Sequence, residues 1–141
     1  MRPIFQVLLV LVLFLGATVA AAAPPKDKED ASEVVTGKVR QLNTSVDKHE
    51  DGRVVTKHTA LVWVTKVERT TPDNGRVLKA GRMITVRWSR VTWQSGRAVG
   101  HTYEVQEKTA VRAWLGRQCG GEGFYIIDNA AGLETLNKQG K

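Results

Sequence analysis

Short runs of β-branched and other apolar residues follow one another from Val34 onward, separated by stretches rich in glycine, asparagine and aspartate. None of the runs keeps a helical period for long, and this pattern is typical of strands. The five runs cover residues 33–42, 53–68, 83–93, 109–115 and 124–128. The pattern predicts an all-β domain over residues 34–136 with five strands.

Alternation within these runs predicts which side chains face the core. In the second run, Ala60, Val62 and Val64 share one face, and Trp63 lies on the other with Leu61. Gly37, in the middle of the first run, predicts a bend or bulge of the kind found in coiled barrel strands.

The third run, "MITVRWSRVTWQSGR", places arginines among tryptophans, so it could be either a ligand-stacking surface or a core strand. In an unbroken strand, Trp88 shares a face with the apolar Ile84 and Val86, and Arg87 points to the opposite side. A β-bulge at Ser89 and Arg90 would turn Trp93 toward the core side. We therefore expect Trp88 in the core, Arg87 exposed and Trp93 pointing inward.

The connections help to define the architecture. Residues 43–52 form a polar connection between the first two runs, and "YEVQEKTAV", residues 103–111, could be a short helix between the third and fourth strands. A five-stranded OB-like barrel, which closes with a segment between its third and fourth strands, uses every run. We favour it over a two-sheet sandwich.

The N-terminal residues 1–23 have the layout of a secretory signal peptide. Arg2 precedes an apolar run that gives way to small residues, and we expect a helix that is cleaved between Ala20 and Ala23. The alternative, an uncleaved membrane anchor, is disfavoured because a span needs about 20 strongly apolar residues. We expect a secreted or periplasmic protein with a flexible spacer at 24–33, a frayed tail at 137–141 and no permanent membrane span.

The order of "VVTGKVRQL", "LKAGRMITVRW", "TAVRAWL" and "GGEGFYIID" resembles small secreted bacterial OB-like β-barrels, broadly similar to the netrin-like and tissue-inhibitor barrel class. The resemblance implies a barrel fold over nearly all of the chain after the signal peptide. The cysteines characteristic of that class are missing, including the N-terminal cysteine that would reach a protease metal. The resemblance therefore does not imply metalloprotease inhibition.

No motif in the sequence indicates an enzyme, a cofactor or a metal site. Asp47, His49, Glu50 and Asp51 cluster in "DKHEDG", which is also the composition of a solvated hairpin tip. The single cysteine, Cys119, excludes an internal disulfide and leaves a dimer through Cys119 possible. We expect no catalytic activity, no cofactor and no bound metal.

The formal net charge of +7 supports solubility and attraction to anionic surfaces, but because the charge is spread along the chain we favour an ordinary solvated surface over a dedicated binding site. We expect a non-enzymatic binding or accessory protein whose partner is an unknown protein or an anionic polysaccharide or lipid surface. Nucleic acid is disfavoured because it is scarce outside the cytoplasm. As the alternative function, binding of an anionic polymer such as an acidic glycan, wall polymer or membrane surface would use Arg87, Arg90, Trp93 and Arg97.

Overall fold

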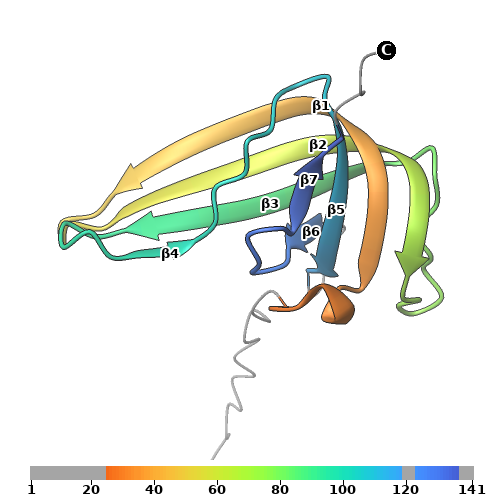
Figure 1. Cartoon of the computed structure of the whole chain (residues 1–141), viewed down its shortest axis with the longest axis horizontal. Coiled ribbons are helices and arrows are strands. Elements are labelled where there is room, and N and C mark those ends of the chain that lie inside the picture. The colour runs from red at the N-terminus through yellow and green to blue at the C-terminus, as the bar shows by residue number, and fades with distance from the viewer. Residues whose placement is uncertain (1–24, 119–122, 137–141) are drawn as a thin grey trace, which may run out of the picture.

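A computed structural model describes residues 25–118 and 123–136 (Figure 1). The signal peptide expected at 1–23, the tail expected at 137–141 and Cys119 lie outside the described residues. The described part contains the 3-10 helix η1 (Lys28–Asp30) and the strands β1 (Glu33–Lys48), β2 (Val54–Thr70), β3 (Met83–Thr92), β4 (Ala98–Gly100), β5 (Ala110–Arg117), β6 (Gly123–Ile126) and β7 (Leu133–Thr135). Within it, no helix is long and apolar enough to cross a membrane.

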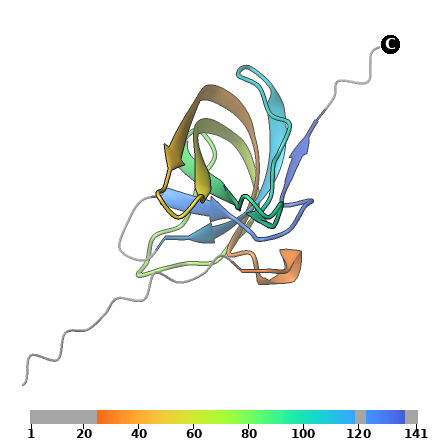
Figure 2. The same cartoon turned by 90° about the vertical axis from the view of Figure 1, so that its left-hand side faces the viewer.

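Five of the strands form a closed barrel in the order β1-β2-β3-β6-β5, and β1 pairs with β5 to close the ring (Figure 2). Every pairing in the ring is antiparallel except that of β3 with β6, which is parallel. Two further strands, β4 and β7, pair with β3 and β5. The prediction of an all-β barrel is confirmed, whereas β4 and β7 were not foreseen.

The barrel core consists of the inward-facing side chains of the ring strands and of Leu133 from β7. Burying each of its valine, leucine, isoleucine and phenylalanine side chains contributes about 1.5–3 kcal/mol. From β3 the core receives Ile84, Val86 and Trp88, as the alternation predicted. The other buried members are Val35, Val39, Ala60, Val62, Val64, Val111, Ala113, Leu115, Phe124, Ile126 and Leu133.

The first two strands are long and curl around the barrel because their pairing contains irregularities. The register between β1 and β2 shifts at three places, one of them between Thr36 and Gly37. A Cβ added to Gly37 would lie 2.6 Å from the carbonyl oxygen of Trp63. Glycine therefore allows the two backbones to approach closely at the predicted bend.

Beyond the barrel, β1, β2 and β3 continue together with β4 as a projecting sheet, which we call the arm: residues 42–48, 54–59, 88–92 and 98–100 (Figure 1). Residues 43–48, expected to belong to a polar connection, are part of β1. The turn is shorter than expected: His49 donates its N–H to the carbonyl of Arg53 at 2.8 Å. Polar side chains are compatible with this strand because both faces of the arm lie outside the barrel.

The segment 101–109 contains no helix, so the helix expected within residues 103–111 is wrong. Its apolar residues do not form a helical face. Tyr103 and Val105 instead pack against the barrel core, and Ala110 and Val111 already belong to β5.

Residues 25–32 lie against the base of the barrel, where a flexible spacer was expected over 24–33 (Figure 1). Ala31 is buried with Val34, Trp114 and Ile127 in a second small core. The ammonium of Lys28 lies 3.5 Å from the ring centroid of Trp114. The N–H of Asp128 also donates to the carbonyl of Pro25 at 2.8 Å, so this polar segment is docked by apolar, cation–π and backbone contacts.

Candidate ligand-binding cleft

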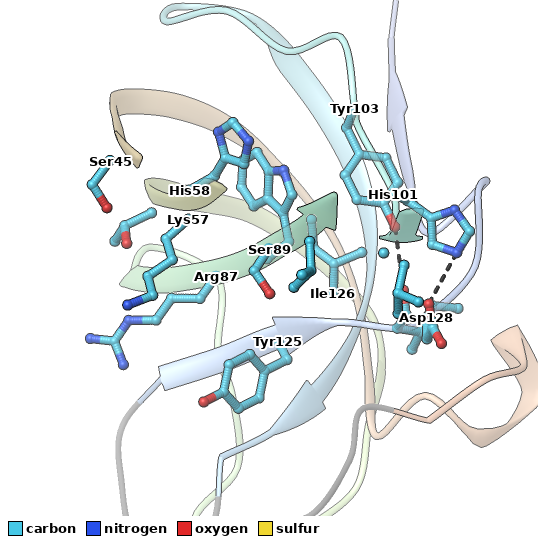
Figure 3. A pocket seen from close by; sticks show the side chains of 16 residues that line it. Ser45, Lys57, His58, Arg87, Ser89, His101, Tyr103, Tyr125, Ile126 and Asp128 are labelled. Atoms are coloured by element: carbon cyan, nitrogen blue, oxygen red, sulfur yellow. Dashed lines mark hydrogen bonds and ion pairs between the residues drawn. The ribbon is translucent and has the colours of Figure 1, made fainter. Parts of the chain in front are cut away.

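A cleft of about 620 Å³ opens where β3 and β6 diverge (Figure 3). The parallel pairing of the two strands ends at Arg87 and Tyr125, and β4 begins to pair with β3 only at Arg90. The gap between β6 and β4 along the edge of β3 leaves this opening. Residues of β1, β2, β3, β4, β6 and the segments after β4 and β6 line it.

Two cations extend to the same side of the cleft from neighbouring strands, Lys57 of β2 and Arg87 of β3 (Figure 3). Arg87 is exposed and donates from Nη1 to Oε1 of Gln118 at 3.1 Å. Among the described residues, no carboxylate forms an ion pair with Arg87. Its charge is therefore not neutralised by any described carboxylate.

The charge of Lys57 is partly neutralised by its neighbour on β1. Lys57 Nζ lies 2.8 Å from Oδ2 of Asp47, and both side chains are exposed. The hydrogen bond and the charge of Lys57 lower the pKa of Asp47 below its usual value. Because exposed ion pairs contribute little, Lys57 can exchange Asp47 for an anionic ligand at small cost.

The inner wall of the cleft is aromatic. Trp88 stacks on His58, with ring centroids 5.0 Å apart, and meets the ring of Tyr103 edge-on. Only 7% of Trp88 is exposed, and its indole Nε1 is buried without a hydrogen-bond partner among the described residues. An indole N–H in such a position usually finds an acceptor.

On the opposite side, His101 Nε2 lies 3.0 Å from Oδ1 of Asp128, a contact that ties the segment after β4 to the segment after β6 (Figure 3). The hydroxyl of Tyr103 lies 2.7 Å from the carbonyl oxygen of Asn129 and 3.3 Å from that of Ile127. Burial, and secondarily the charge of Asp128, raise the pKa of Tyr103 to about 12. These contacts fix this wall of the cleft.

The structure does not bring the four predicted site residues together. Arg87 is exposed in the cleft, as expected, but Arg90 is on the opposite face of β3 and donates from Nη1 to Oγ1 of Thr102 at 2.9 Å. Trp93 and Arg97 stack at the tip of the arm, with the guanidinium carbon 5.1 Å from the ring centroid.

The prediction that Trp93 points inward is wrong. The pairing of β2 with β3 runs without a register shift to Thr92, so the bulge considered at Ser89 and Arg90 is absent. Trp93 begins a turn, in which its N–H donates to the carbonyl of Arg97 at 2.9 Å. It is half-buried beside Arg97 and does not belong to the core.

Alternation within single strands could not identify Lys57, His58 and Tyr125 as cleft residues. The cleft depends on cross-strand register, which places Asn43, Thr59 and Arg87 in one row and Ser45, Lys57 and Ser89 in the next. On the same outer face, Trp63 is 37% exposed and pairs with Met83. The prediction that Trp63 lies on the face opposite Ala60, Val62 and Val64 is confirmed.

The described residues contain no group of three or more histidine, cysteine or acidic side chains that could hold a metal ion. Among the described residues, the cleft therefore offers cationic side chains, aromatic rings and one indole N–H without an acceptor.

Comparison of the chain with models of protein families, with curated proteins and with solved structures found no match. Of the resemblance to small β-barrels, the structure confirms the closed all-β barrel of five strands.

Proposed function

We propose that the chain is a secreted or periplasmic, non-enzymatic binding protein and that the cleft holds an anionic group of an extended ligand such as an acidic glycan. The observation that carries the proposal is the placement of Arg87 and Lys57 beside the buried aromatic wall. Arginine recognises carboxylate and sulfate groups through paired, charge-assisted hydrogen bonds.

We also propose that the barrel is OB-like. In support, the ring order β1-β2-β3-β6-β5 contains one parallel contact, between the third and the last barrel strand. OB barrels bind oligosaccharides and oligonucleotides on the face of their second and third strands. Arg87, Lys57 and Trp63 occupy the corresponding face here, and a secreted protein would meet acidic glycans there rather than nucleic acid.

An extended ligand is favoured over a single small anion because the outer face continues beyond the cleft. Trp63 and Met83 are exposed on β2 and β3, and the row between them and Arg87 consists of Gln41, Leu61 and the small Thr85. A sugar ring could stack on Trp63 while a neighbouring acidic group reaches Arg87. Stacking of this kind is one of the ways that aromatic side chains bind polymers.

The test is a binding titration with labelled polygalacturonate as a carboxylate polymer and dextran sulfate as a sulfate polymer. Arg87→Gln should weaken binding by about tenfold or more, the equivalent of one charge-assisted hydrogen bond. Arg97→Gln, which removes the same charge at the tip of the arm, is the matched control and should change the affinity little. Binding of the parent protein should weaken as salt is added.

Two outcomes would contradict the proposal. If neither polymer is retained at low salt, the cleft does not bind polyanions. If Arg97→Gln weakens binding as much as Arg87→Gln, the interaction is a general effect of positive charge and not a property of the cleft.

A further inference from the structure

The outer half of β1 is a free sheet edge. The pairing of β1 with β5 ends at Lys38, and the next backbone bonds across this edge join Val39 to Lys108 and Thr109. Residues 43–48 have no strand neighbour on this side within the described parts of the chain, and every one of their side chains is exposed. A strand edge of this length is a template for pairing with another strand.

The structure also shows which backbone groups face the free edge. The N–H of Leu42 donates to Oε1 of Glu107 at 3.0 Å, so it points away from β2. In an antiparallel pair, successive residues alternate between facing the partner strand and facing away from it. The backbone N–H and C=O groups of Thr44, Val46 and Lys48 therefore face the free edge, as the N–H of Leu42 does.

We propose that a second copy of the chain pairs with this edge, β1 against β1, in an antiparallel arrangement about a twofold axis at Ser45. In this register Thr44 lies opposite the partner's Val46, and both residues present edge-facing backbone groups, as the hydrogen-bonding pattern requires. Opposite residues lie on the same face, so the exposed side chain of Val46 packs against the partner's Thr44.

Charge complementarity favours a second copy as the occupant. Because the N–H of Leu42 is already held by Glu107, the new backbone hydrogen bonds are those between Thr44 and the partner's Val46. At each end of the pairing, Lys48 lies beside the partner's Leu42 and the carboxylate of the partner's Glu107. The twofold axis repeats this lysine–glutamate contact at both ends of the new pairing. The other edge of the arm, β4, is three residues long and offers too little backbone for an equivalent contact.

The pairing would extend the candidate cleft. Ser45 lines the cleft and is on the proposed axis, so the clefts of the two copies meet there on one face of a continuous sheet. Two cationic clefts on one face would bind a long polyanion more tightly than one cleft, through effective concentration. The dimer itself does not depend on this use, so its test is independent of ligand binding.

Cysteine cross-linking in a Cys119→Ser background tests the register. The two copies of residue 45 would form a pair that is not hydrogen-bonded, with Cα atoms about 4.5 Å apart, which suits a disulfide. Ser45→Cys should therefore form a cross-linked dimer under mild oxidation. Asn43→Cys is the matched control: the two copies of residue 43 would be displaced by four positions, about 13 Å, and should not cross-link.

A mixture of the Asn43→Cys and Asp47→Cys proteins should cross-link, because residue 43 lies opposite the partner's residue 47. Absence of a Ser45→Cys dimer, or equal rates for Ser45→Cys and Asn43→Cys, would overturn the proposal. If the edge instead pairs with a strand of a different protein, Ser45→Cys will likewise give no dimer, and the proposal is wrong.

Sedimentation without cross-linking gives a second readout. Val46→Pro removes an N–H that faces the free edge, not β2, so the fold should persist, as circular dichroism can verify. Val46→Pro should weaken the dimer, whereas Val46→Thr should leave it intact. A parent protein that stays monomeric up to about 1 mM would contradict the proposal.

Discussion

The imidazole of His58 and the indole of Trp88 stack with only 14° between their planes, at the point where the barrel continues into the arm. The histidine is held from its other side, because its Nδ1 lies 2.9 Å from the hydroxyl oxygen of Thr44. The pair thus joins three neighbouring strands through one polar and one aromatic contact, and it forms the inner wall of the cleft.

This stack should make stability depend on pH. Partial burial lowers the pKa of His58 from its ordinary value of 6.5, so the folded state favours the neutral ring. The unfolded chain then binds more protons than the folded one. The contribution of neutral His58 to stability is therefore present above pH 6.5 and is lost as pH falls through the folded-state pKa. The free energy of unfolding, measured with urea between about pH 7 and pH 5, should decrease toward acid.

His58→Gln should reduce that slope, since it removes the titrating group. His49→Gln, a change in the exposed turn of the arm, is the control and should leave the slope in place. An unchanged slope in His58→Gln would show that another group is responsible.

Tyr103 should produce the corresponding effect at alkaline pH. Its pKa is raised to about 12, above the ordinary value of 10.0, so the folded state retains the proton that the unfolded chain loses. The contribution of Tyr103 to stability is present below pH 10.0 and should be lost as pH rises toward 12. Tyr103→Phe should flatten the alkaline part of the stability curve measured by urea denaturation, and a curve unchanged by this substitution would contradict the prediction.

Gly37→Ala should destabilise the barrel. The added methyl group would lie 2.6 Å from the Trp63 carbonyl and 2.7 Å from Cγ1 of Val62, so the paired backbones must separate. Overpacking of this kind costs about 1–3 kcal/mol, measurable by urea denaturation. Ser45→Ala, on the same strand within the arm, should change stability by less than about 0.5 kcal/mol.

The ion pair of Glu33 and Arg117 should matter more than the exposed pair of Asp47 and Lys57. Glu33 is fully buried, and its Oε1 accepts from Arg117 Nε at 2.7 Å. Arg117→Met leaves that carboxylate without its cation and should cost about 3–5 kcal/mol. Lys57→Met breaks a pair in solvent and should cost less than about 1 kcal/mol.

The double variant Glu33→Leu, Arg117→Met should recover part of the stability lost in the single variant, because no charge is left unpaired in the barrel. A double variant at least as unstable as Arg117→Met would show that the loss comes from packing and not from the charge.

Sequence patterns predicted the parts of the fold that depend on single strands. Alternation identified the buried Trp88 and the exposed Arg87 because β3 remains regular along its length. The prediction failed at Trp93 because it assumed a bulge at Ser89 and Arg90, whereas β3 stays regular to Thr92 and Trp93 begins the turn. Alternation also failed for residues 43–48, because a strand that is solvated on both faces has no hydrophobic period.

The cleft could not be predicted, because its residues are brought together by register and by the divergence of β3 and β6. Lys57 and Arg87 are 30 positions apart in the chain, and only the pairing of β2 with β3 makes them neighbours. The parallel contact of β3 with β6 likewise leaves no local signal in the sequence. Residues 25–32 likewise dock through partners far along the chain: Ala31 is buried against Trp114, and Lys28 pairs with Glu134.

The closing contact of β1 with β5 also affects how the chain folds. The hairpins of β1, β2 and β3 join residues that are near in sequence and can form early. Glu33, by contrast, must find Leu115 across most of the chain, and β3 must find β6 in the same way. Closing such long loops carries an entropic cost before any contact is gained, so barrel closure should set the folding rate. Until β5 arrives, the inner half of β1 is an unpaired edge that strands of other molecules can join.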